Sequence, residues 1–238
     1  SLNLEEFSNL QRISLLGEER VFDFLWQDHP IRFFLPNAAS DLIQRHILKT
    51  SSFFEIELLT RFRRYVPKGA IVVDAGANIG NHTVYFAKIC GAQKIHAFEP
   101  LHETFRILAR NSDLNAAEQV VCYNLALGAG FGRADIAQYC GNNMGATQLG
   151  ARVDGRYEVR PLDSFDLERI DVLKIDVEGA EVAVLDGARQ SLARCKPAIL
   201  IEILPEAGLR PHEFLVSLGY ERAEVLGQRD FVYLPKVK

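Results

Sequence analysis

The stretch VVDAGANIGNHTVYF, residues 72–86, joins a short apolar run to a turn with two glycines and then to an amphipathic segment. Short apolar runs bounded by glycine are typical of buried strands, and the segment after Gly80 has the apolar period of a helix. Asp74 ends the predicted strand, and Gly76 and Gly80 let the chain turn sharply before the helix. The stretch therefore predicts a strand, a tight turn and a helix whose unpaired N–H groups can face an anionic ligand.

Apolar runs alternate with helical patterns from about residue 69 onward, which favours a parallel sheet with helices on both faces. The predicted strands are residues 70–74, 94–98, 120–125, 172–176 and 198–203. The predicted helices are residues 81–90, 102–114, 181–194 and 211–218. Right-handed crossovers between parallel strands then give a doubly wound order, so we expect an α/β, Rossmann-like fold.

Three segments depart from this alternation. Residues 132–160 contain short polar–apolar runs rich in glycine, which predict a hairpin-like β insertion beside the sheet. Near the end, GYERAEVL and DFVYLP predict a closing antiparallel pair. The first part of the chain predicts a helix at 4–16, strands in VFDFLW and IRFFLP, and a helix at 40–49. We expect residues 1–66 to form an extension or cap on a core domain of residues 67–238.

Composition limits the class of protein and its partners. A chain of 238 residues, 48% of them hydrophobic, suits one sizeable core. The net charge of -4 leaves no basic excess for a nucleic-acid backbone, and no apolar run approaches the roughly 20 residues of a membrane helix. The four cysteines are widely spaced, which argues against a zinc site or a disulfide framework. We expect a cytoplasmic protein without nucleic-acid or membrane partners.

The spacing around the glycine turn discriminates between ligands. A dinucleotide fingerprint needs a middle glycine where this chain has Asn78, so a pyrophosphate is disfavoured. The Asn78 amide and the Asp74 carboxylate instead suit the carboxylate and ammonium of an amino acid. Glu99 ends the second strand nineteen residues after Gly80, where a carboxylate can accept hydrogen bonds from ribose hydroxyls. Adenosine joined to an amino acid is S-adenosylmethionine, which is therefore the predicted cofactor.

The adenine ring is expected near the residues that follow the third strand. These are Asn124 and Ala126, although an ordinary strand end before a glycine turn explains them equally well. The predicted cofactor-binding residues are Asp74, Gly76, Asn78, Gly80, Glu99, Asn124 and Ala126.

Five segments resemble successive motifs of the FkbM-type methyltransferases: VVDAGANIGNHTVYFA, IHAFEP, NLALG, PLDSF and VLKIDVEGAEVAVLDGA. The resemblance extends over residues 72–203, and DVEGAE is its most specific part. The family belongs to the class I S-adenosylmethionine-dependent methyltransferases, so the resemblance implies a seven-stranded sheet with an antiparallel last strand. It also implies O-methylation of a hydroxyl on a sugar, a polysaccharide precursor or a polyketide-like metabolite. The cofactor contacts that it implies are Asp74, Gly76, Gly80 and Glu99.

The segment KIDVEGAE supplies the candidate catalytic groups. A hydroxyl nucleophile benefits from a general base, and Asp176 stands at the tip of the fourth predicted strand. We expect Asp176 to be the base or a substrate-orienting group, with Lys174 and Glu178 as second choices. Glu178 also fits a helix start, where negative charge is stabilised. Glu202 ends the fifth strand near Asp176, but two carboxylates without a third ligand do not predict a metal.

Two other functions remain as alternatives. One is an NAD-dependent oxidoreductase, and the other is a catalytically silent interaction protein that keeps a methyltransferase fold. Cofactor binding separates them from a methyltransferase. Outside the motifs, His82 is expected to be exposed or to cap its helix, and Glu55 to lie on a helix surface. The oligomeric state is left open.

Overall fold

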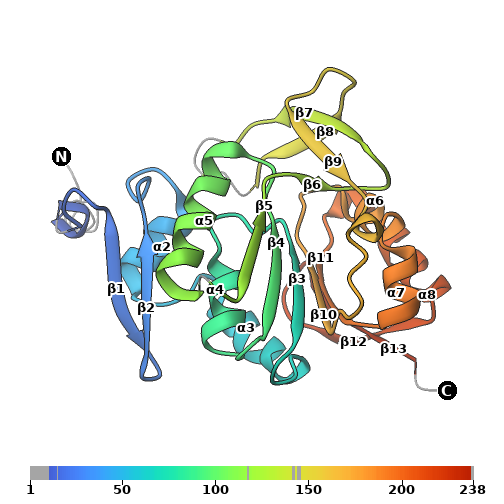
Figure 1. Cartoon of the computed structure of the whole chain (residues 1–238), viewed down its shortest axis with the longest axis horizontal. Coiled ribbons are helices and arrows are strands. Elements are labelled where there is room, and N and C mark those ends of the chain that lie inside the picture. Colours follow the sequence, from blue (N-terminus) through green and yellow to red (C-terminus); the bar gives the residue numbers. More distant parts are fainter. Residues whose placement is uncertain (1–10, 15, 117, 141–142, 144–145, 237–238) are drawn as a thin grey trace.

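A computed structural model describes residues 11–14, 16–116, 118–140, 143 and 146–236, and its centre is a seven-stranded sheet (Figure 1). The strand order is β12-β13-β11-β10-β3-β4-β5. The strands are β3 (Ile71–Ala75), β4 (Lys94–Phe98), β5 (Val120–Tyr123), β10 (Val172–Ile175), β11 (Ala198–Glu202), β12 (Tyr220–Val225) and β13 (Asp230–Pro235). Neighbours from β5 to β11 pair in parallel, whereas β13 is antiparallel to β11 and to β12. The predicted fold class and reversed last strand are confirmed.

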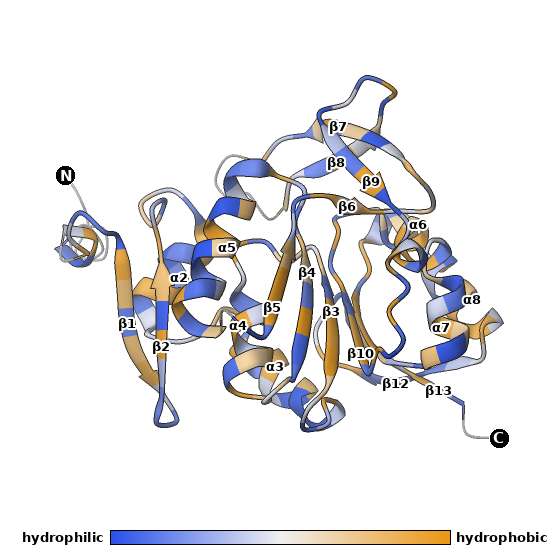
Figure 2. Cartoon of the chain, viewed as in Figure 1, coloured by the Kyte–Doolittle hydropathy of each residue, from blue (hydrophilic) through white to orange (hydrophobic). Residues whose placement is uncertain are grey.

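Helices cover both faces of this sheet (Figure 1). One face carries α2 (Leu42–Thr50), α3 (Ile56–Phe62), α4 (Asn81–Lys88) and α5 (His102–Ala116), and the other carries α6 (Glu181–Asp186), α7 (Arg189–Cys195) and α8 (Arg210–Ser217). Figure 2 shows hydrophobic residues running along β3, β5 and β10. Central parallel strands are buried on both faces, which is why they read as continuous apolar runs.

The chain order places a switch point in the middle of the sheet. After β3 the chain continues through β4 to the edge strand β5, and it later returns to β10 on the other side of β3. In such sheets ligands bind at the carboxyl ends of the strands where the order reverses. The register sets Lys174 of β10 opposite Asp74 of β3 at this point.

Two predicted elements end earlier than expected. The helix predicted at 181–194 is two helices, α6 and α7, with Gly187 between them. A Cβ on Gly187 would lie 2.0 Å from the carbonyl oxygen of Gly128, so this position packs directly on another backbone segment. The strand predicted at 120–125 ends at Tyr123, and the chain then leaves the central sheet. Both differences come from contacts between segments far apart in the sequence.

The β insertion is larger than the predicted hairpin. It forms a four-stranded sheet, ordered β6-β9-β7-β8, that lies beside the ends of the central strands (Figure 1). Its strands are β6 (Ala126–Leu127), β7 (Gly132–Gln138), β8 (Gln148–Ala151) and β9 (Tyr157–Arg160). The described residues also form the short 3-10 helices η1 (Arg63–Tyr65), η3 (Leu162–Phe165) and η4 (Pro205–Ala207).

The N-terminal segment packs on the helices of the first face. The antiparallel pair β1 (Val21–Trp26) and β2 (His29–Phe34) confirms the two predicted strands, and α2 confirms the predicted helix. Phe53 contacts Tyr85 of α4, with ring centroids 5.2 Å apart. Most of the helix predicted at 4–16 lies outside the described residues, and residues 11–14 are helical. In the described part of the chain, no helix has the length and apolarity needed to cross a bilayer.

Candidate active site

A cavity of about 220 Å³ opens at the carboxyl ends of the central strands. Its wall is built from the turn after β3, the ends of β4, β10 and β11, the β insertion, and the segment around α2 and α3. This is the switch point that the sheet topology defines.

The glycine turn after β3 is held tightly between two neighbouring strands. Gly76 has φ +76, and a Cβ at this position would lie 1.8 Å from the carbonyl oxygen of Asp176. The N–H groups of Gly76 and Ala77 both donate to the carbonyl oxygen of Phe98, at 3.0 and 2.9 Å. Asn78 is also left-handed, with φ 50, a conformation that asparagine tolerates better than most residues. The turn therefore presents its backbone to the cavity in one fixed shape.

Glu99 lies beside this turn with only 6% of its surface exposed, and it lines the cavity. Its Oε2 accepts the Asn78 N–H at 3.0 Å, and its Oε1 accepts the Leu101 N–H at 2.8 Å. Each carboxylate oxygen keeps a further lone pair for a ligand hydroxyl. Burial raises the pKa of Glu99 to about 7, while the two backbone N–H groups and Lys174 oppose this shift.

Cofactor affinity is expected to rise with pH because of this carboxyl group. Its pKa lies near 7, so Glu99 is mostly protonated at pH 6 and ionised at pH 8. Only the ionised form accepts hydrogen bonds from both ribose hydroxyls, so S-adenosylhomocysteine should bind about tenfold more weakly at pH 6. Calorimetric titration from pH 6 to 8 measures this dependence. Glu99→Gln should bind weakly with a flat pH profile, and an equally flat profile in the unmodified protein would contradict the assignment.

A buried ion pair lies behind the turn. Lys174 Nζ is 3.1 Å from Asp74 Oδ1 and 3.5 Å from Asp176 Oδ2, and only 4% of the Lys174 side chain is exposed. Lys174 Nζ also donates to the carbonyl oxygen of Gly76 at 2.6 Å. Burial lowers the pKa of Lys174, but the attraction of Asp74 and Asp176 outweighs burial and raises this pKa above its ordinary value. The ammonium thus ties the glycine turn to the end of β10.

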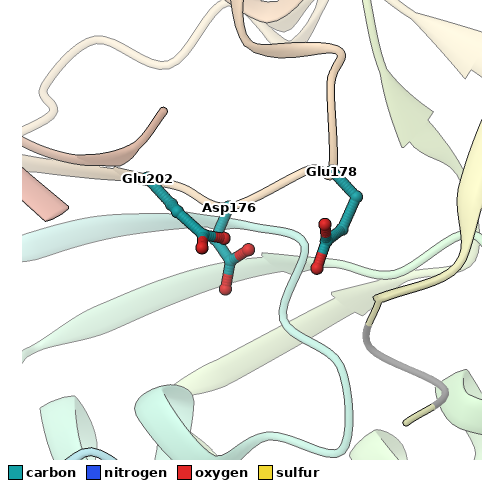
Figure 3. Close-up of side chains that lie close together, drawn as sticks. All are labelled: Asp176, Glu178 and Glu202. Carbon is teal, nitrogen blue, oxygen red and sulfur yellow. The ribbon is translucent and has the colours of Figure 1, made fainter. Parts of the chain in front are cut away.

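Three carboxylates converge in the cavity wall at the ends of β10 and β11. Figure 3 shows the Asp176 and Glu202 carboxylates side by side, with Glu178 turned toward them from the loop after β10. One oxygen from each residue lies within 4.8 Å of the others, a spacing that a divalent cation can bridge. Burial and the charge of Asp176 raise the pKa of Glu202 to about 9, and the same two causes raise the pKa of Glu178 to about 7. The expectation that the site works without a metal stays a prediction.

The predicted site residues separate into two groups. Those that line the cavity are Gly76, Asn78, Glu99, Ala126, Lys174, Asp176 and Glu178. Asp74, Gly80 and Asn124 lie behind this wall. Asp74 is fully buried and accepts a hydrogen bond from the Thr83 hydroxyl at 2.6 Å, so its carboxylate faces Lys174 and α4 instead of a ligand ammonium.

The other two residues support the wall from behind. Gly80 begins α4 with φ 89, where a Cβ would lie 3.0 Å from the side chain of Leu108. Asn124 Nδ2 donates to the carbonyl oxygens of Glu99 and Pro100, at 2.9 and 3.0 Å. Asn124 therefore fixes the loop that carries Glu99.

Several wall residues were not predicted. His82 is 8% exposed, contrary to the expectation of an exposed side chain, and its Nε2 lies 3.3 Å from Glu55 Oε2. Glu55 directly precedes α3, whose bounds were not predicted, and it lines the cavity instead of lying on a helix surface. The remaining unpredicted wall residues include Ile43, Phe54, Asn143, Thr147 and Leu149, whereas Glu202 lines the cavity near Asp176 as its place at a strand end suggested. Only tertiary packing brings these segments together. The one available sequence signal was the pair of acidic residues that follows Phe54, namely Glu55 and Glu57.

Comparisons with known proteins agree with this fold. A solved FkbM methyltransferase from Methylobacillus flagellatus KT superposes with a TM-score of 0.53 at 17% identity, covering 84% of this chain and 63% of that one. The sheet order, the glycine turn and this likeness define the fold of a class I methyltransferase. The family model described as Methyltransferase FkbM domain matches residues 74–231. The chain belongs to the FkbM methyltransferase family, and its cofactor is S-adenosylmethionine.

Curated relatives in this family come from fungi and archaea. Methyltransferase sdnD of Sordaria araneosa is 27% identical over 183 residues, which cover 61% of this chain and 71% of the relative. Methyltransferase 1 of Beauveria bassiana is 31% identical, covering 51% and 59% of the two chains. The hexuronic acid methyltransferase AglP of Haloferax volcanii is 30% identical, covering 68% and 69%. The matched segment thus spans about 60 to 70% of these relatives.

Proposed function

We propose that the protein transfers a methyl group from S-adenosylmethionine to a hydroxyl of a small molecule, such as a sugar, a polysaccharide precursor or a polyketide-like metabolite. The observation that carries this proposal is the cavity wall itself. Glu99, the glycine turn and Asp176 line one cavity, and Asp176 lies beside the turn, where an acceptor hydroxyl would meet the cofactor. The name of the Haloferax volcanii relative, a hexuronic acid methyltransferase, supports a sugar-like acceptor.

The chain would hold the cofactor at three points. Glu99 would accept hydrogen bonds from the ribose hydroxyls. Ala126 and Leu127, which line the cavity at the start of the insertion, would contact the adenine ring. The backbone of the glycine turn, with Asn78, would hold the amino acid end near the start of α4, where unpaired N–H groups favour a carboxylate. The bound cofactor supplies a methyl group already activated by its sulfonium.

Asp176 is the proposed base for the acceptor hydroxyl. Its side chain is 35% exposed toward the cavity, and Lys174 Nζ lies 3.5 Å from Oδ2. Its carboxylate can accept the hydroxyl proton as the oxygen bonds to the methyl carbon. Lys174 is then a positioning residue, because it also fixes the Gly76 carbonyl. Glu178 would orient the acceptor from the loop after β10.

The first test is cofactor binding, measured by isothermal titration with S-adenosylmethionine, S-adenosylhomocysteine and NAD. We expect micromolar binding of the first two and none of NAD. Glu99→Ala should weaken this binding at least about tenfold, because two charge-assisted hydrogen bonds are lost. Glu103→Ala, an exposed residue in the first turn of α5, is the matched control and should bind normally.

Each contrary result points to a stated alternative. Binding of NAD alone would favour an oxidoreductase. A folded protein that binds none of the three ligands would favour a silent interaction protein. An EDTA-treated sample tests the expected absence of a metal requirement, since loss of methyl transfer that Mg²⁺ restores would refute it.

The organisation of the whole protein is also a proposal. We propose that residues 1–66 act as a cap on a methyltransferase domain of residues 67–238, because Ile43, Phe54 and Glu55 line the same cavity as the core residues. The acceptor is proposed to be a small molecule without involvement of nucleic acid or membrane. A cytoplasmic location stays a prediction.

A further inference from the structure

The ammonium group of S-adenosylmethionine needs a partner other than Asp74, the residue that the sequence suggested for it. Asp74 is fully buried and is not among the described residues that line the cavity. Its Oδ1 lies 3.1 Å from Lys174 Nζ, and its Oδ2 accepts a hydrogen bond from the Thr83 hydroxyl at 2.6 Å. Because a buried ammonium without hydrogen-bond acceptors is unfavourable, another group of the cavity wall has to meet it.

The described wall residues offer five carboxylates for this role, those of Glu55, Glu99, Asp176, Glu178 and Glu202. Glu99 already accepts two backbone N–H groups and is proposed to hold the ribose. Asp176 lies 3.5 Å from Lys174 Nζ and is the proposed base. Glu202 ends β11, and Glu178 follows β10. Glu55 differs from these four because it comes from the segment before the central sheet and contacts α4.

Glu55 lies beside the first turn of α4. Its Oε2 is 3.3 Å from Nε2 of His82, the second residue of this helix, and 38% of the Glu55 side chain is exposed in the cavity wall. The start of α4 is also the proposed place of the cofactor carboxylate. In an α-amino acid the carboxylate and the ammonium are bonded to the same carbon, so the partner of the ammonium has to lie next to this helix start. Glu55 meets that condition.

Asn81, the first residue of α4, holds the residue before Glu55. Its Oδ1 accepts the Phe54 N–H at 2.9 Å, and its Nδ2 donates to the Phe54 carbonyl oxygen at 3.0 Å. Asn81 is 5% exposed, so both hydrogen bonds are shielded from water. This reciprocal pair fixes the backbone of Phe54 against the start of α4 and thereby sets where Glu55 begins.

The backbone at Glu55 is itself in an uncommon conformation. Glu55 has φ 57, in the left-handed region that residues other than glycine adopt where their surroundings hold them. On the other side of Phe54, the ring of Phe53 is fully buried with its centroid 5.2 Å from that of Tyr85, one turn further along α4. Residues 53–55 therefore contact α4 at three places, and α4 determines the position of the Glu55 carboxylate.

We propose that Glu55 binds the ammonium of the cofactor and that Asn81 is a positioning residue that acts through the backbone of Phe54. This inference rests on the proposed function, in which the glycine turn and the start of α4 hold the amino acid end of S-adenosylmethionine. It gives the N-terminal segment a part in binding the methyl donor as well as in capping the cavity.

The experiment compares two ligands that differ only in the ammonium. They are S-adenosylhomocysteine and its analogue in which a hydrogen atom replaces the amino group, and binding is measured by isothermal titration. We expect S-adenosylhomocysteine to bind at least about tenfold more tightly than the analogue, as for a charge-assisted hydrogen bond. Glu55→Gln should lose this preference while its affinity for the analogue stays unchanged. Glu57→Gln, an exposed residue two positions away in α3, is the matched control and should keep the preference.

A second set of variants tests Asn81. Asn81→Ala should reduce the preference for S-adenosylhomocysteine in the same way, and it should add nothing further in the Glu55→Gln background, because it acts through Glu55. Asn115→Ala is the matched control. Asn115 of α5 makes the same pair of hydrogen bonds to the backbone of Arg32, at 3.0 and 2.6 Å, on another part of the N-terminal segment. This variant should keep the preference, and affinity for the analogue reports the folding of each variant.

The outcomes separate this inference from the proposed function. Failure of the unmodified protein to bind either ligand would refute the proposed function. Equal binding of the two ligands, or a Glu55→Gln variant that keeps the preference, would overturn the Glu55 inference alone. Loss of the preference in Asp176→Asn, with Glu55→Gln unaffected, would assign the ammonium to Asp176. An additive effect of Asn81→Ala in the Glu55→Gln background would refute the positioning role.

Discussion

Gly76→Ala is expected to lose cofactor binding, with an affinity for S-adenosylhomocysteine at least about a hundredfold weaker. A Cβ here would lie 1.8 Å from the Asp176 carbonyl oxygen and 2.9 Å from its carbonyl carbon, so the turn or the end of β10 has to move. Overpacking of this kind costs about 1 to 3 kcal/mol, and the left-handed φ of +76 adds about 1 to 2 kcal/mol. Since the turn is proposed to contact the cofactor, its displacement should affect affinity as well as stability.

Gly91→Ala separates these two effects. Gly91 has a similar φ of +67, but a Cβ there would meet nothing within 4 Å. This variant should lose only the conformational contribution and should bind the cofactor normally. Thermal unfolding and calorimetric titration of both variants provide the measurement. If the two variants behave alike, the close contact between Gly76 and β10 does not determine the shape of the turn.

The second large effect is expected for Asp176→Asn, which should reduce kcat by about 10² to 10⁴ while cofactor affinity changes little. The magnitude is that of a lost general base, because the amide cannot accept the hydroxyl proton. Methyl transfer to a hydroxylated small-molecule acceptor is measured at saturating cofactor. A variant that folds, binds cofactor and keeps near-normal turnover would exclude Asp176 as the base and leave Glu178 as the next candidate.

Thermal unfolding across pH supplies the control for this variant. The raised pKa values of Glu202 and Glu178, about 9 and 7, mean that the folded protein binds these protons more tightly than the unfolded chain. Stability without ligand should therefore fall as pH rises from about 5 to 9. Removing the Asp176 charge lowers both pKa values, so the variant should show a shallower decline. A steeper decline would indicate damage to the fold.

The local part of the site could be predicted from the sequence, because a strand, a glycine turn and a helix are encoded within fifteen residues. Gly76 and Asn78 were found in this way, Glu99 was found at the end of the next strand, and all three line the cavity. The break at Gly187 was not predicted, and it lies where the chain packs closely on the backbone of Gly128, fifty-nine residues earlier. A glycine inside an apolar helical pattern gave only a weak signal of it.

The ion pair between Lys174 and Asp74 shows a second limit of local patterns. The two residues are one hundred positions apart and meet only because β10 aligns with β3 in this register. Asp74 was therefore expected to face the ligand, as its place in the motif indicates, whereas it neutralises a buried lysine. His82 and Glu55 met in the same way, through the packing of α3 against α4, which no pattern in either segment indicates.

The walls of the cavity come from two separate sources. The loops that follow consecutive central strands form most of the wall proposed to hold the cofactor. Phe54 and Glu55 belong to the segment before the central sheet, and Leu149 belongs to the β insertion. If the turn and Glu55 hold the methyl donor as proposed, substitutions of the outer residues Phe54 and Leu149, which face the cavity, should change the choice of acceptor more than the affinity for the donor.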